Sequence, residues 1–187
     1  LSYNELVIDR FATFLNGRLT LVTGASGFVG RAVVAALDRE AVPVREAVRS
    51  WSGGSSSRHC VVGEIGPETD WSAALAGVDT VIHLAARVHV LREHARDPER
   101  AFHRTNVEGT ERLARAAAAA GVRRLVYASS VKVNGESTAP WSAYDEGSPV
   151  RPEDPYGASK AVAEERLRAV SASTRLEFAI LRPPLMY

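Results

Sequence analysis

The sequence predicts an α/β fold in which a doubly wound parallel sheet is covered by helices on both faces. Along the chain, the apolar pattern switches repeatedly between the two-residue period of strands and the 3.6-residue period of helices. The predicted strands are short and almost continuously apolar, which is typical of parallel strands buried on both faces. A chain of 187 residues is long enough for one domain with a sizeable core, but not for two.

The predicted elements alternate between strand and helix as far as residue 181. Strands are expected at Leu19–Thr23, Val42–Arg49, Cys60–Val62, Thr80–Ala85, Leu125–Ser129 and Glu177–Leu181. Helices are expected at Gly27–Arg39, Trp71–Ala76, Glu108–Ala120 and Pro155–Val170. Another helix is expected to start at Asp97-Pro98-Glu99, which combines an N-cap residue, a first-turn proline and an acid. Ser50–Arg58 and Asn134–Asp154 contain turn-forming residues and are expected to be loops.

Composition argues against several classes of protein. The formal net charge of +1 does not suggest binding to nucleic acid or to an anionic membrane. The single cysteine, Cys60, cannot form an internal disulfide. No apolar run reaches the roughly 18–20 residues of a transmembrane helix, and the first residues do not resemble a signal peptide, so a cytoplasmic location is expected. The five histidines lack the spacing of metal ligands, so no metal site is expected.

A glycine-rich segment, Thr23–Gly30, lies where the first predicted strand becomes the first predicted helix. Glycines at this spacing allow a tight turn, a close approach of the backbone to a pyrophosphate and close packing of helix on strand. The start of the helix then offers N–H groups and a positive dipole end to the anion. The segment therefore predicts a Rossmann-like dinucleotide site and a strand order of 3-2-1-4-5-6. The residues expected to bind the cofactor here are Gly24, Ser26, Gly27, Phe28, Val29 and Gly30.

The end of the second predicted strand favours NADP over NAD. An acid at this point binds the ribose hydroxyls of NAD, whereas an arginine accommodates the 2′-phosphate of NADP. This strand ends in Val48-Arg49-Ser50, without an acid. Arg49 and Ser50, assisted by Arg58, are the residues expected to favour NADP, since arginine pairs strongly with phosphate. The alternative is that Arg49 is an ordinary solvated surface residue.

Tyr156 and Lys160 are four residues apart, so a helix places them on the same face. A nearby ammonium stabilises phenolate and lowers the pKa of tyrosine, which is about 10 when unperturbed. Tyr156 is therefore expected to act as a general acid or base. This spacing alone usually marks an exposed helix face, but its position after a nucleotide-binding turn favours the catalytic interpretation.

Two segments resemble the extended branch of the short-chain dehydrogenases/reductases that acts on nucleotide sugars. They are Thr23–Gly30, with glycines in a G-x-x-G-x-x-G pattern, and Asp154–Lys160, which reads D-P-Y-G-A-S-K. The resemblance covers about residues 18–187 and implies a Rossmann-like domain, an NAD(P) cofactor and a nucleotide-sugar substrate, and it is compatible with a homodimer. Relatives continue past Arg182-Pro183-Pro184, so most of the C-terminal substrate domain is expected to be absent from this chain. Residues 1–17 are expected to be an N-terminal extension. Val7, Ile8, Phe11 and Leu15 form one apolar helix face that packs on the domain or on a partner, or the segment is a remnant of the expression vector.

The resemblance also implies further site residues. Asn134 occupies the place of a family tyrosine that lies four residues after the catalytic hydroxyl, which maps this hydroxyl onto Ser130, with Ser129 as the alternative. Asn106 matches an asparagine that supports the active site. Lys132–Asn134 departs from the family pattern and is expected to line the mouth of the site and to tune the substrate. The cofactor residues implied by the resemblance are Glu64, Ile65, Leu84, Ala85, Ala86, Tyr156, Lys160 and Pro183.

The leading functional hypothesis is redox chemistry at C4 of a nucleotide-diphosphate sugar. Because Arg49 favours NADP, 4-keto reduction is preferred over 4-epimerisation with tightly held NAD. A dehydratase is disfavoured, because Val131-Lys132 stands where that class carries acidic residues. A non-catalytic dinucleotide-binding module is the alternative from another class, and the presence of Ser130, Tyr156 and Lys160 together argues against it.

Overall fold

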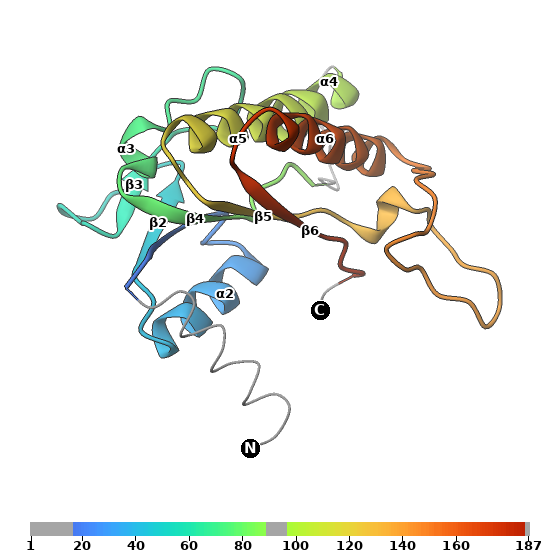
Figure 1. Ribbon diagram of the computed structural model, residues 1–187, viewed down its shortest axis with the longest axis horizontal. Helices are drawn as coiled ribbons and strands as arrows, with labels where there is room; N and C mark the ends of the chain where they lie inside the picture. The colour runs from blue at the N-terminus through green and yellow to red at the C-terminus, as the bar shows by residue number, and fades with distance from the viewer. Residues whose placement is uncertain (1–16, 89–96, 186–187) are drawn as a thin grey trace.

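The computed structural model describes residues 17–88 and 97–185. They form a six-stranded parallel sheet with the order β3-β2-β1-β4-β5-β6 (Figure 1). The predicted fold class and strand order are therefore confirmed. The strands are β1 (Leu19–Thr23), β2 (Val44–Val48), β3 (His59–Val61), β4 (Val78–His83), β5 (Arg124–Ala128) and β6 (Glu177–Leu181).

The fourth strand differs most from its predicted bounds. It was expected at Thr80–Ala85, but it begins at Val78 and ends at His83. Leu84 and Ala85 leave the sheet although they are apolar, and the Ala85 N–H bonds to the side-chain hydroxyl of Thr23. This bond joins the end of β4 to the end of β1, at the start of the glycine-rich turn.

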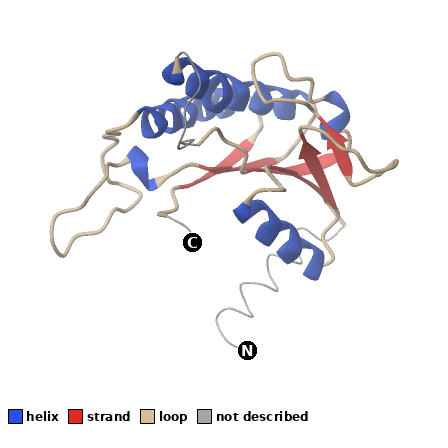
Figure 2. Ribbon diagram, turned by 180° about the vertical axis from the view of Figure 1, so that it is seen from behind, coloured by secondary structure: helices blue, strands red, loops and turns tan. Residues whose placement is uncertain are grey.

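Helices lie on both faces of the sheet, as Figures 1 and 2 show from opposite sides. One face carries α5 and α6, side by side, and the other carries α2. The helical elements are α2 (Phe28–Arg39), α3 (Ser72–Leu75), α4 (Pro98–Phe102), the π-helix η1 (His103–Glu108), α5 (Gly109–Ala119), the 3₁₀-helix η2 (Val131–Val133) and α6 (Pro155–Ala172).

The π-helix η1 joins α4 to α5, so that helical structure runs without a break from Pro98 to Ala119. The start of α4 follows the predicted signal: Asp97 is the N-cap, and its carboxylate accepts a hydrogen bond from the backbone N–H of Arg100. The sequence pattern did not indicate the π-helical turn. Such turns occur frequently at functional sites, and this one contains Asn106.

The core lies between the sheet and the pair α5 and α6. The fully buried side chains of Leu21, Val81, Leu125 and Tyr127 point from the strands towards this pair, where they meet Leu113 and Leu167. Burial of a large apolar side chain contributes about 1.5–3 kcal/mol, so this layer holds the second half of the chain on the sheet. No helix of the described residues is long and apolar enough to cross a membrane.

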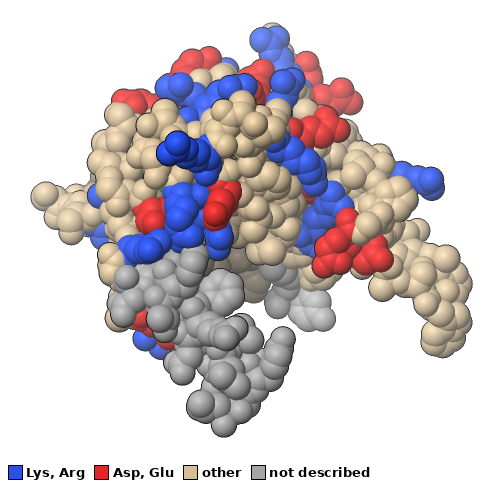
Figure 3. All heavy atoms as spheres, viewed as in Figure 1, with Lys and Arg blue, Asp and Glu red and all other residues tan. Residues whose placement is uncertain are grey.

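Surface charges of both signs are interspersed on the face shown in Figure 3. Exposed ion pairs of the described residues include Arg18–Asp79 and Arg124–Glu177. No group of His, Cys, Asp and Glu that could hold a metal ion occurs among the described residues. The predicted apolar face of Val7, Ile8, Phe11 and Leu15 lies outside the described residues, and the domain division at residue 17 stays a prediction.

Candidate active site

The glycine-rich turn after β1 has a backbone that only glycine permits at two positions. Gly24 has a φ of +71°, and a Cβ there would lie 2.7 Å from the backbone nitrogen of Ala85. A Cβ on Gly30 would lie 2.0 Å from the carbonyl oxygen of Gly24. The turn opens directly into α2, whose N-cap Gly27 has no capping side chain. The first N–H groups of α2 are therefore available to an anion, as a pyrophosphate site requires.

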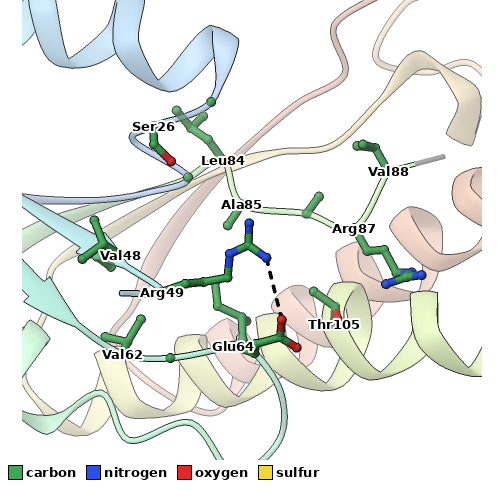
Figure 4. Close-up of a pocket in the computed structure, with 16 residues that line it drawn as sticks. Ser26, Val48, Arg49, Val62, Glu64, Leu84, Ala85, Arg87, Val88 and Thr105 are labelled. Carbon is green, nitrogen blue, oxygen red and sulfur yellow. Dashed lines mark ion pairs between the residues drawn. The ribbon is translucent and has the colours of Figure 1, made fainter. Parts of the chain in front are cut away.

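A cavity of about 430 Å³ lies beside this turn, beyond the carboxyl ends of β1, β2 and β4 (Figure 4). Its volume is in the range of small-molecule and cofactor sites. The predicted cofactor residues that line it are Gly24, Ser26, Gly27, Arg49, Glu64, Ile65, Leu84, Ala85 and Ala86. The cavity is also lined by residues that were not predicted to bind the cofactor: Ala47, Val48, Val62, Gly63, Arg87, Val88 and Thr105. Several of them adjoin predicted strand ends, which was the available signal.

The remaining predicted cofactor residues lie outside the lining of this cavity. Gly30 is buried under the turn, Phe28 is 64% exposed, and Ser50 is exposed beside Arg49. Pro183 lies next to η2, where its carbonyl oxygen accepts a hydrogen bond from the backbone N–H of Val131. The cofactor contacts expected of these residues, and of Val29, Tyr156 and Lys160, stay predictions.

Arg49 and Glu64 face each other at the rim of the cavity (Figure 4). Their closest nitrogen and oxygen atoms are 3.7 Å apart, and both side chains are largely exposed. Arg58, which was expected to assist Arg49, is instead bound elsewhere. It donates to both carboxylate oxygens of Asp38 at 2.9 Å and to Glu46 at 2.7 Å. These two acids on α2 and β2 attract Arg58, so the expectation for this residue was wrong.

Lys160 is buried on the face of α6 that meets the sheet. Its ammonium donates a 2.7 Å hydrogen bond to the backbone carbonyl oxygen of Ala128, at the end of β5. It lies 4.4 Å from the ring centroid of Tyr127 and 5.9 Å from that of Tyr156. Burial lowers the pKa of Lys160 to about 7, against the opposing effect of the negative charge of Glu164. Lys160 therefore titrates near neutral pH.

The pKa of Tyr156 shifts in the opposite direction to the prediction. Burial raises it, and the negative charge of Asp154 raises it further. The cation that acts against these effects is Lys132, not Lys160. The prediction that Lys160 lowers the pKa of Tyr156 was therefore wrong, because burial outweighs the cationic contribution and the Lys160 ammonium is directed at Ala128.

The two serines after β5 have different surroundings. Ser129 is buried and donates a 2.6 Å hydrogen bond to a carboxylate oxygen of Glu164, so its hydroxyl proton is not available to a substrate. Ser130 is only half-buried, and its side-chain oxygen accepts a 3.2 Å hydrogen bond from the backbone N–H of Lys132. Ser130 thus keeps its hydroxyl proton for another acceptor. This difference favours Ser130 over Ser129 as the candidate catalytic hydroxyl.

Asn106 connects the cavity wall to the helix that carries Tyr156. Its side-chain amide exchanges hydrogen bonds of 2.8 and 3.0 Å with the backbone N–H and carbonyl of Arg87. It also donates to the hydroxyl of Ser159 at 3.0 Å, and Ser159 donates to the carbonyl oxygen of Tyr156 at 2.7 Å. Asn106 thus links the cavity wall to the backbone of Tyr156, and the supporting role that the resemblance implies for it stays a prediction.

A buried ionic network behind the site was not identified from the sequence. Glu164 is 1% exposed and receives hydrogen bonds of 2.9 and 2.6 Å from Arg182. Although burial acts to raise the pKa of Glu164, the bonds from Arg182 and Ser129 hold it below its ordinary value. The only local signal was an acid four residues after Lys160, on the helix face that Tyr156 and Lys160 share.

Asn134 belongs to this network and does not line an open mouth. It is 5% exposed, and its amide donates to the carbonyl oxygens of Ser148 and Pro149 at 3.1 and 3.2 Å. Its own oxygen accepts a 3.4 Å bond from Arg182. The expectation that Asn134 tunes the substrate was therefore wrong: its side chain anchors the loop 134–154 from inside.

His83 is a second buried polar group that the sequence did not assign. Its ring nitrogens contact the hydroxyls of Thr23 and Thr110 at 2.6 and 3.0 Å. Burial, with the positive charge of Lys160, lowers its pKa to about 3, so the ring is neutral at physiological pH. His83 thus joins β1, β4 and α5 beneath the turn and the catalytic residues.

Comparison with known proteins agrees with this geometry. Residues 20–187 match the NAD dependent epimerase/dehydratase family. The chain is 36% identical over 168 residues to a UDP-glucose 4-epimerase of Vibrio cholerae, covering 89% of the chain and 51% of that relative. A short-chain dehydrogenase/reductase from Agrobacterium tumefaciens, solved with bound NAD, is 40% identical with a TM-score of 0.74, over 88% of this chain and 48% of that one.

A third similar protein, MoeE5, was solved with UDP-glucose and NAD. It is 34% identical with a TM-score of 0.74, over 89% of this chain and 54% of that one. The chain thus spans about half the length of the relatives it matches. From its family match, its fold and its glycine-rich turn, we conclude that the chain belongs to the NAD-dependent epimerase/dehydratase family, within the extended short-chain dehydrogenases/reductases.

Proposed function

We propose that this chain is the cofactor-binding and catalytic part of an NAD(P)-dependent enzyme that acts at C4 of a nucleotide-diphosphate sugar, by reducing a 4-keto group. The observation that carries this proposal is the link between cavity and catalytic helix. Arg87 lines the cavity, Asn106 holds the backbone of Arg87, and the same amide bonds to Ser159, three residues after Tyr156. A dinucleotide in the cavity and a substrate at Tyr156 would therefore be held by one connected set of residues.

The residues present suit the dinucleotide that the family implies. The glycine-rich turn leaves no room for a Cβ at Gly24 or Gly30 and offers helix N–H groups to a pyrophosphate. The small residues Ala85 and Ala86 let a flat ligand lie against the backbone after β4. When bound, the nicotinamide would supply the hydride that the reduction requires.

The chain supplies the proton and orients the substrate. Tyr156 donates its phenolic proton to the C4 oxygen as hydride reaches C4, so that the ketone becomes an alcohol. Ser130 donates a hydrogen bond to the same oxygen and stabilises the charge that develops on it. Lys160, whose pKa is lowered to about 7, lies on the same helix face, and its ammonium ties this face to the end of β5 through the Ala128 carbonyl oxygen.

For the cofactor we propose NADP, because of the rim of the cavity. Arg49 lies at the end of β2 and presents an exposed guanidinium there, and no acid occupies that strand end. The similar structures were solved with NAD, so Arg49 is the specific reason to expect a different choice here. The alternative reaction, 4-epimerisation with tightly held NAD, is favoured by the similarity to a UDP-glucose 4-epimerase.

One assay separates these reactions. The chain, and in parallel the protein encoded by its full reading frame, is given a 4-keto nucleotide sugar with NADPH or with NADH. Net loss of NADPH indicates reduction. Interconversion of a sugar pair without net loss of cofactor indicates epimerisation, and a preference for NADH would contradict the proposed role of Arg49.

Replacing Tyr156 by Phe tests the catalytic assignment. We expect turnover to fall by about 10²–10⁴-fold, with the Kd for the cofactor nearly unchanged, because only the proton donor is lost. Tyr144→Phe is the matched control, since the Tyr144 hydroxyl bonds to the carbonyl oxygen of Ser137 within the exposed loop. Turnover that survives in Tyr156→Phe would remove Tyr156 from the mechanism.

A further inference from the structure

Lys132 lies between the two segments that carry the candidate catalytic hydroxyls. It belongs to η2, two residues after Ser130, and its backbone N–H donates to the Ser130 side chain. Its carbonyl oxygen contacts the first turn of α6: a Cβ on Gly157 would lie 2.7 Å from that oxygen. The backbone of Lys132 therefore touches both the Ser130 turn and the start of the helix that carries Tyr156.

The Lys132 side chain strengthens this connection with an ion pair. Its ammonium donates to Asp154 Oδ2 at 2.7 Å and to Glu136 Oε1 at 2.7 Å. Asp154 is the N-cap of α6, and its other carboxylate oxygen accepts the backbone N–H of Gly157. The Asp154 side chain is only 18% exposed, whereas that of Glu136 is 42% exposed. The bond to Asp154 is therefore the less screened of the two.

The Lys132–Asp154 pair also acts electrostatically on Tyr156. Asp154 raises the pKa of Tyr156 and Lys132 lowers it. Lys160 lies 5.9 Å from the ring, on the same helix. Among residues 17–88 and 97–185, two aromatic residues also lie near the ring: Phe102 of α4 meets it edge-on at 6.2 Å, and Tyr127 of β5 lies on the other side of Lys160.

We propose that Lys132 is a positioning residue for Tyr156, acting by binding the N-cap carboxylate of α6 and by balancing its negative charge, which lies two residues before Tyr156. The inference rests on the proposed acid–base role of Tyr156. It assigns the effective cation to the turn that carries Ser130, so that one short segment orients the substrate oxygen and adjusts the proton donor. Without Lys132, the charge of Asp154 would favour the neutral phenol more strongly.

Four variants test this with a readout that needs no turnover. The protein is labelled with ¹³Cζ-tyrosine, the Tyr156 resonance is assigned by its loss in Tyr156→Phe, and its chemical shift is followed against pH while circular dichroism remains native. We expect Lys132→Met to move the midpoint to higher pH, by roughly 0.5–1 pH unit. Asp154→Asn, which keeps a good N-cap residue, should move it to lower pH. Lys132→Arg should restore the wild-type midpoint, and Glu136→Gln should leave it unchanged.

The result specific to this proposal is that the midpoint of the Tyr156 titration shifts in opposite directions in Lys132→Met and Asp154→Asn. Loss of a purely structural contact would instead shift the midpoint in the same direction in both variants. Equal midpoints in folded wild type and Lys132→Met, or shifts of the same sign in the two variants, would overturn the inference. If Lys132→Met does not fold, Asp154→Asn and Lys132→Arg still decide it. Failure of the proposed function is recognised separately, as activity that survives Tyr156→Phe.

Discussion

The two halves of the sheet are built on different principles. Around β1, β2 and β4, the cavity is shaped by backbone and small side chains, such as Gly24, Gly30 and Ala85, and its rim pair Arg49–Glu64 is largely exposed. Around β5, β6 and α6, ionisable side chains are buried: Lys160 is 2% exposed and Glu164 is 1% exposed. The cofactor half depends on positions where a side chain would not fit. The catalytic half depends on buried ionisable groups, of which Glu164 is bonded by Arg182 and Ser129, and Lys160 by the Ala128 carbonyl oxygen.

The largest effect should come from breaking the buried charge pair. We expect Glu164→Gln to lower the free energy of unfolding by about 3–5 kcal/mol, because it leaves the Arg182 guanidinium poorly compensated next to the core. Glu177→Gln is the matched control, since it removes the same charge from an exposed pair with Arg124 and should cost at most about 1 kcal/mol. Urea denaturation measures both variants, and equal losses would contradict the contrast between the two halves.

A smaller effect on stability, but loss of cofactor binding, should follow from adding a methyl group to the turn. Gly30→Ala would place a Cβ against the Gly24 carbonyl, and the backbone would have to shift at a cost of about 1–3 kcal/mol. The shift would also displace the N–H groups expected to bind the pyrophosphate. Gly54→Ala meets no atom within 4 Å and should change neither property. Calorimetry with NAD and NADP tests this, and normal binding by Gly30→Ala would exclude the turn as the phosphate site.

The third expected effect depends on pH. The pKa of Lys160 is about 7 in the folded protein and 10.5 in a solvated lysine, so between these values the unfolded chain binds a proton that the folded protein does not. The contribution of Lys160 to stability is therefore fully present above about pH 10.5 and is lost as the pH falls through 7. Between these pH values, Lys160 makes the free energy of unfolding rise with pH by at most about 1.4 kcal/mol per pH unit.

Lys160→Met should remove this rise of the free energy of unfolding with pH, as measured by urea denaturation between pH 7 and 10. Lys132→Met is the matched control. Ion pairing raises the pKa of Lys132, so its contribution is fully present below the ordinary lysine pKa and is lost only as the pH rises through the raised value. In Lys132→Met, the free energy of unfolding should therefore still rise with pH between 7 and 10 as in the wild type. A Lys160→Met protein with the wild-type slope would show that Lys160 is not desolvated.

Local chemistry made much of the fold and half of the site predictable. Leu19–Thr23 and Glu177–Leu181 have their predicted bounds, and Asp97 and Asp154 both serve as N-caps with a proline after them. The turn at Gly24–Gly30 was predictable because the steric demand of a tight turn is expressed in the identity of its own residues. Helix period alone sufficed to place Tyr156 and Lys160 on one face of α6.

The properties of the catalytic half were decided by the tertiary structure. Glu164 has one local partner, Arg168 on the next turn of α6, but its shorter bonds come from Ser129 and Arg182, which are 35 and 18 residues away. Asn134 is bonded by residues 148, 149 and 182. Whether a charge is stabilised or penalised depends on what is packed around it, which no local pattern contains. For this reason the amino-acid sequence determined the sheet, the turn and the candidate residues, whereas burial and long-range pairing decided that Lys160 titrates near pH 7 and that Lys132 is the cation opposing the raised pKa of Tyr156.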